Sequence, residues 1–158
     1  MSGLKRIVGI VIACAMLGTT QSACADDEHS VARRWMDLLL ESIRNDFARP
    51  VVHARNLFHI SSAMWDGWAV WEDGPTPWLM PDDVFEAKDI EAARNECISH
   101  AAYQILLFRF NPSPGFAEME SRYIDLMEEL GYAPDFGSTT GDSPAAVGNQ
   151  IAAQYILF

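Results

Sequence analysis

The sequence predicts an all-α fold of about five helices, preceded by an export signal. Apolar residues recur three or four positions apart through most of the chain, which is the spacing of amphipathic helices. No stretch alternates apolar and polar residues as a half-buried strand does, and prolines and glycines fall between the periodic segments. We therefore expect residues 26–158 to form one helical domain that is part of a larger helical bundle.

The export signal is predicted at residues 1–25. Lys5 and Arg6 precede an apolar run that is too short to span a bilayer, and small residues then lead to an A-x-A cleavage site ending at Ala25. A competing interpretation makes Cys24 the lipidated first residue of a lipoprotein, but Gln21 stands where that motif wants a large apolar residue. We expect the plain exported form, periplasmic or extracellular, with no membrane span in the mature chain.

The first two helices are predicted on either side of Arg49-Pro50, a dipeptide that interrupts helical backbone. The first has an apolar stripe consisting of Val31, Trp35, Leu38, Leu39 and Ile43. The second should span residues 50–71 and has two adjoining apolar rows, namely Val51, Ala54, Phe58 and Trp65, and Leu57, Ile60, Met64, Trp68 and Trp71. Because these rows cover much of its circumference, we expect it to be the central and most buried helix.

Two more helices follow a loop at residues 72–83, where closely spaced prolines and Gly74 prevent regular structure. The third helix should begin at Val84 or Ile90 and end at Phe108, with an apolar face of Ile90, Ala93, Cys97, Ala101, Ile105 and Phe108. The fourth should span residues 116–130 and be closed by Gly131, since a left-handed residue commonly ends a helix.

The fifth helix is predicted from its start signals, because Ser143 can cap it and Pro144 suits its first turn. Its last residues are apolar and have neither a cap nor a polar tail. We expect few packing partners for Ile151, Tyr155, Ile156, Leu157 and Phe158, and we interpret this edge as truncation.

Charge and cysteine content exclude several classes of protein. The formal net charge is −11, and it becomes two units more negative once Lys5 and Arg6 are removed, so the mature chain should repel nucleic acid and anionic membrane surfaces. Cys97 is the one cysteine after residue 25, which leaves no intramolecular disulfide. Its apolar flanks predict a small buried side chain instead of a reactive thiol.

The most suggestive polar set is Arg55, His59, Ser62 and Asp66, which share one stripe of the second helix. One hypothesis makes His59 a proton-transfer group, and another places His53, His59 and Asp66 around a metal. Helical metal ligands usually stand three or four residues apart, whereas these stand six and seven apart. We therefore favour a stripe that hydrogen-bonds neighbouring helices or faces water, and we assign no catalytic, cofactor-binding or metal-binding residue.

Other candidates also have a structural interpretation. His100 lies between Glu96 and Gln104 at helical spacing, which predicts a surface histidine with an acidic neighbour. A group of four tryptophans could form a ligand platform, but three of them, Trp65, Trp68 and Trp71, have helical core spacing and only Trp78 lies in a loop, so core packing is favoured. The sequence contains no Walker-type loop, G-x-S-x-G, C-x-x-C or H-E-x-x-H motif.

Three regions resemble the N-terminal part of bacterial vanadium-dependent haloperoxidase-like proteins, which belong with the type 2 phosphatidic acid phosphatases. They are residues 31–50 (VARRWMDLLLESIRNDFARP), residues 52–69 with the segments VHARNLFH and AMWDGWA, and residues 141–152 (GDSPAAVGNQIA). The resemblance implies a helical bundle whose oxyanion site comes from the later half of the protein. That site consists of a lysine, two arginines, a Ser-Gly-His turn and a histidine that binds vanadium or is phosphorylated.

None of this catalytic pattern can be placed here, because Lys88 is the one lysine after residue 25 and no Ser-Gly-His occurs. The resemblance therefore implies a non-catalytic N-terminal scaffold without a cofactor of its own. Vanadate would be bound by the full-length parent, and the partner would be the missing catalytic region or an equivalent helical unit. The rival hypothesis is a stand-alone secreted helical binding module.

Overall fold

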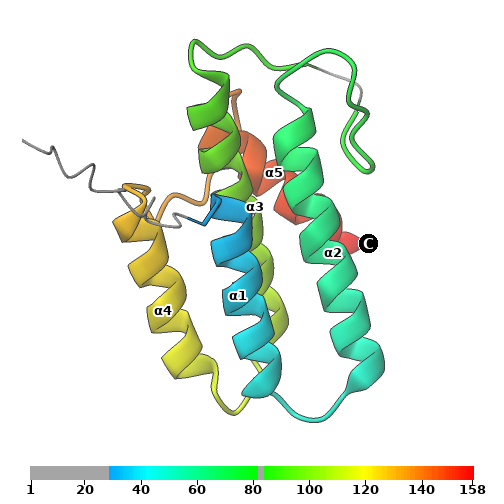
Figure 1. The fold of residues 1–158 in the computed structure, drawn as a ribbon, viewed down its shortest axis with the longest axis vertical. Coiled ribbons are helices and arrows are strands. Elements are labelled where there is room, and N and C mark those ends of the chain that lie inside the picture. Colours follow the sequence, from blue (N-terminus) through cyan, green and yellow to red (C-terminus); the bar gives the residue numbers. More distant parts are fainter. Residues whose placement is uncertain (1–28, 82–83) are drawn as a thin grey trace, which may run out of the picture.

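The computed structural model describes residues 29–81 and 84–158, and Figure 1 shows its architecture. These residues form five helices and no strand, which confirms the predicted all-α class. The helices are α1 (Val31–Arg44), α2 (Pro50–Ala69), α3 (Ile90–Phe110), α4 (Phe116–Glu129) and α5 (Pro144–Leu157). The predicted signal peptide and the alternative lipidation site at Cys24 lie outside the described residues.

Helices α1 to α4 run alternately down and up in Figure 1, and α5 crosses behind α2 and α3. The sequence signals for the helix ends hold well. The Ser143 side chain accepts a hydrogen bond from the amide of Ala146 at the start of α5, and Gly131 closes α4 with a φ of +81°. Helix α2 ends at Ala69, two residues earlier than predicted, and α3 extends to Phe110.

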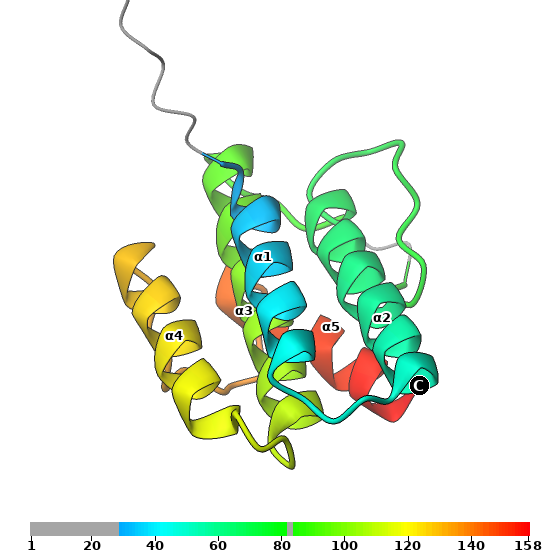
Figure 2. The same cartoon turned by 60° about the horizontal axis from the view of Figure 1, so that its bottom comes forward.

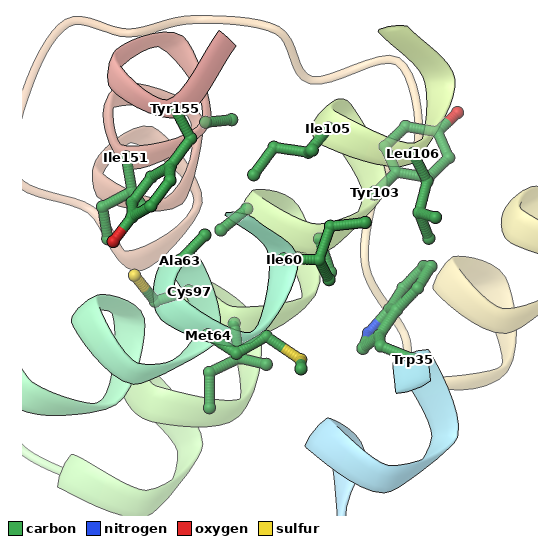
Figure 3. Close-up of a cluster of buried hydrophobic side chains, with 14 of the residues drawn as sticks. Trp35, Ile60, Ala63, Met64, Cys97, Tyr103, Ile105, Leu106, Ile151 and Tyr155 are labelled. Carbon is green, nitrogen blue, oxygen red and sulfur yellow. The ribbon is translucent and has the colours of Figure 1, made fainter. Parts of the chain in front are cut away.

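The central helix is α3, so the prediction that the second helix would be central is wrong. Helix α3 packs against all four other helices, and residues on every side of it are buried. Small side chains allow this close approach. A Cβ atom at Gly148 of α5 would lie 2.5 Å from the carbonyl oxygen of Cys97 and 2.8 Å from the Cβ of His100. Figure 3 shows Trp35, Ile60, Ile105 and Ile151 meeting from four helices in this core.

The two apolar rows of α2 differ in their surroundings. Ile60, Met64 and Trp71 of the second row are buried, whereas every member of the first row is exposed. The expected burial of Val51, Ala54, Phe58 and Trp65 is therefore wrong. Their place inside is taken by Asn56, His59, Asp66 and Gly67. Gly67 has a steric reason to face inward, since its Cβ would lie 3.3 Å from the backbone of Ile98.

Helix α5 is better packed than the sequence indicated. Ile151 and Tyr155 are fully buried, and Ile156 packs partly against the core. The expectation of few partners is therefore wrong for these three residues. Only Leu157 and Phe158 at the end of the helix are largely exposed, at 85% and 64%. The error arose because the partners of α5 belong to α2 and α3, far away in the sequence.

Candidate functional site

The Asp66 carboxylate joins three parts of the fold. It is fully buried in α2 and accepts hydrogen bonds from the amides of Trp78, at 2.6 Å, and Leu79, at 3.0 Å. Its Oδ2 atom also accepts a hydrogen bond from the hydroxyl of Tyr155, at 3.0 Å. Burial, together with the negative charge of Asp66, raises the pKa of Tyr155, which keeps that hydroxyl protonated and donating. Asp66 thus anchors both the loop after α2 and the end of α5.

His59 lies in α2 seven residues before Asp66, and it contacts Arg109 of α3. A guanidinium nitrogen of Arg109 lies 3.3 Å from Nδ1 of His59 and 2.9 Å from the carbonyl oxygen of Tyr155. Because a guanidinium can only donate, Nδ1 of His59 must accept, and the histidine is neutral. Burial lowers the pKa of His59, and the positive charges of Arg109 and Arg55 lower it further. His59 is therefore poorly suited to hold a proton near neutral pH.

Arg55 completes what we call the cationic cluster, defined as the two charged residues Arg55 and Arg109 together with the neutral His59 beside them. The pKa of Arg109 is lowered by burial and by the nearby charge of Arg55. The one side-chain hydrogen bond of Arg55 among the described residues is a long contact of 3.4 Å to Oδ1 of Asn56. Neither arginine forms an ion pair with any carboxylate in the described ranges. The cluster is therefore an uncompensated positive region in an acidic chain.

Exposed aromatic rings adjoin this cluster, and we define Phe58, Trp65, Trp78 and Phe158 as the aromatic face. Between 47% and 64% of each of these residues is exposed. Trp78 holds the face together, with its ring centroid 5.1 Å from that of Phe58 and 5.0 Å from that of Phe158. Both views show the end of α5 lying beside α2 (Figures 1 and 2). The His59 ring, 5.5 Å from that of Phe158, links the face to the cationic cluster.

The structure separates the residues of the suggested metal site. Nε2 of His53 lies 2.8 Å from the carbonyl oxygen of Phe47, while His59 and Asp66 have the partners described above. No group of three or more His, Cys, Asp or Glu side chains in residues 29–81 and 84–158 is arranged to hold a metal ion. The favoured interpretation of the stripe, hydrogen bonding to neighbouring helices or exposure to water, is confirmed for Asp66 and His59, which bond other elements, and for Arg55, which is exposed.

The remaining candidates divide into correct and incorrect predictions. Cys97 is fully buried, and burial raises its pKa to about 12, as expected of an inert thiol. His100 is also buried, and burial lowers its pKa to about 4, so its expected surface position is wrong. Core packing is correct for Trp71, which is 2% exposed, and in part for Trp68, which packs against the core, but it is wrong for Trp65, which is about half exposed like Trp78 of the loop. The exposure of Trp65 follows from the outward orientation of the first row of α2.

An oxyanion site of the haloperoxidase type does not fit the side chains present. Such a site needs several cationic donors converging on one small anion. Lys88 is exposed just before the start of α3, whereas Arg109 lies near the end of that helix, so about 30 Å of helix separates them. Arg109 also directs its donors to backbone carbonyls of Tyr155 and Ile156. Neither vanadate nor phosphate chemistry can be assigned to these residues.

Comparison with protein-family models, with curated proteins and with solved structures finds no match to this chain. None of the helices in the described part of the chain combines the length and the apolar character that crossing a bilayer requires. The assignment of function therefore depends on the residues themselves.

Sequence reasoning missed Arg109 and Tyr155 as members of the site. Tyr155 was grouped with the apolar end of α5, and Arg109 was not considered at all. The position of Arg109 in the last turn of α3 predicts bonds to the carbonyls of its own helix, whereas the structure shows bonds to those of α5. No local signal connects either residue with Asp66 or His59, because 50 and 89 positions separate the bonded pairs.

Proposed function

We propose that this chain is the non-catalytic N-terminal helical scaffold of an exported vanadium-dependent haloperoxidase-like or acid-phosphatase-like protein. In this proposal the catalytic region, which provides the oxyanion-binding residues, packs against the aromatic face. The chain shapes one wall of the bundle and supplies no reacting group. Vanadate or phosphoester chemistry belongs to the partner region alone.

The observation that carries the proposal is the aromatic face itself. A helix that packs in a bundle normally turns its apolar rows inward and its polar residues outward. In α2 the first apolar row faces out while Asp66 and His59 face in. Large exposed apolar patches usually mark interaction surfaces, so a further helical unit is the natural cover for this one.

The resembling segments support a scaffold role because their buried residues connect helices. Asp66 and Gly67 belong to the second segment and Gly148 and Asn149 to the third. Asp66 binds the loop and α5, the two glycines permit close helix contacts, and Nδ2 of Asn149 donates to the carbonyl oxygens of Phe136 and Ser138. All four serve packing within the helical domain.

Two experiments test the proposal. Purified residues 26–158 should give no vanadate-dependent bromination of a dye and no hydrolysis of a generic phosphoester, and bromination above a boiled control would contradict the proposal. Reading the gene beyond codon 158 should reveal an in-frame continuation that encodes a lysine, arginines and Ser-Gly-His.

The second candidate function is a stand-alone secreted binding module that uses the same aromatic face for an independent partner. A stop codon directly after codon 158, together with a folded and monomeric product, would favour this module and contradict the scaffold.

A further inference from the structure

The positive charge of the cationic cluster is unusual for this molecule. Five of the eight arginines in the described residues pair with a carboxylate: Arg33, Arg34, Arg49, Arg94 and Arg122. The other three, Arg44, Arg55 and Arg109, have none, although the chain has twice as many acidic as basic residues, 22 against 11, and of these three Arg55 and Arg109 share one site. Both lie beside His59, Arg55 one helical turn before it in α2 and Arg109 with a guanidinium nitrogen 3.3 Å from Nδ1, and the charge of Arg55 lowers the pKa of Arg109. An uncompensated pair of this kind attracts an anion.

The surroundings of this pair determine the kind of anion. Phe58 is a neighbour of His59 within α2, and Trp78 and Phe158 extend the apolar surface beyond it. A free inorganic anion would leave these rings exposed to water. A carboxylate carried on an apolar polypeptide would pair with Arg55 and cover the rings together, and a guanidinium group binds a carboxylate with two parallel hydrogen bonds.

We propose that Arg55 binds an Asp or Glu side chain of the segment that covers the aromatic face, that the positive charge of Arg109 beside it strengthens this contact, and that apolar residues flank the carboxylate in the partner. The inference rests on the proposed function, since the segment belongs to the catalytic region of the parent protein. Beyond the scaffold role, it specifies a carboxylate with apolar neighbours as the group that the partner presents. Arg55 sets the register of the partner on α2, and the aromatic face supplies most of the buried surface.

The test uses two fluorescently labelled amphipathic helical peptides of leucine and alanine, one with a central Glu and its twin with a central Gln. Binding to residues 26–158 is measured by fluorescence anisotropy. The Glu peptide should bind about tenfold more tightly, which corresponds to about 1.4 kcal/mol. In Arg55→Gln this preference should disappear, because the peptide carboxylate loses its partner. The substitution leaves the core unchanged, since Arg55 is exposed.

Arg44→Gln is the matched control, since Arg44 is exposed, also lacks a carboxylate partner and lies at the end of α1. It changes the net charge equally and should keep the tenfold preference. A second variant, Arg109→Lys, retains the positive charge in the partly buried position and should keep most of the preference for the Glu peptide.

Equal binding of the Glu and Gln peptides would overturn the carboxylate site while leaving the scaffold proposal standing, because the rings alone would then account for the contact. Loss of the preference in Arg44→Gln would also overturn it, since any positive charge would then suffice. If the chain forms dimers in analytical ultracentrifugation and Arg55→Gln dissociates them, a second copy is the occupant and the proposed partner is wrong.

Discussion

Replacing Asp66 with alanine should be among the most damaging single changes in this protein. The carboxylate accepts three hydrogen bonds, and its partners belong to the loop after α2 and to α5. Hydrogen bonds to a charged group contribute about 1.5–3 kcal/mol each. The amides of Trp78 and Leu79 can turn toward water when the carboxylate is removed, but the hydroxyl of Tyr155 cannot, because that residue is fully buried. We expect a loss of about 3–5 kcal/mol in the free energy of unfolding.

For a domain of this size, 1 kcal/mol corresponds to roughly 4 °C in melting temperature, so Asp66→Ala should melt about 12–20 °C lower. Circular dichroism at 222 nm during heating measures this. Asp66→Asn keeps one acceptor oxygen and should lose about half as much. Asp125→Ala is the control, because that aspartate is exposed on α4. A melting temperature for Asp66→Ala within about 2 °C of the unmodified protein would refute the assigned role of Asp66.

Three further predictions follow from the packing of α5 and α3. A chain that ends at Gly141 lacks α5 and should lose its cooperative thermal melt, whereas an unchanged melt would show that α5 is not part of the core. In Gly148→Ala the new methyl group meets the Cys97 carbonyl and should lower stability in urea by about 2 kcal/mol, while Gly137→Ala, which has open space, should be neutral. Because the pKa of folded His100, about 4, lies below the usual 6.5, protonation favours unfolding, and stability should fall by up to about 3 kcal/mol between pH 6.5 and pH 4. His100→Gln should remove that part of the pH dependence, and an identical pH profile would contradict the assignment.

Helix positions followed closely from the sequence because their signals are local. Prolines, glycines and serine caps act within a few residues, and amphipathic spacing identifies each helix without knowledge of its neighbours. Thus Ser143 and Gly131 have the predicted roles in the structure. These local signals were sufficient to predict the all-α class.

The orientation of α2 could not be predicted from its sequence alone. Its apolar residues occur on two faces, and the face that turns inward is decided by partners far along the chain. Asp66 points inward because Tyr155 and the amides after Pro77 are there to meet it. His100 was misassigned for a related reason: its spacing from Glu96 is local, whereas its burial comes from α5 and from the rings of Tyr132 and Phe136.

The central claim, that a catalytic helical region covers the aromatic face, is tested most directly by hydroxyl-radical footprinting with mass spectrometry. Oxidation of Phe58, Trp65 and Trp78 is compared between residues 26–158 and the product of the whole gene, with the exposed Ile90 at the start of α3 as the internal reference. The account predicts that the three aromatic side chains are strongly protected in the whole product, while Ile90 is oxidised equally in both. Equal oxidation of all four residues, or a gene that ends at codon 158, would contradict it.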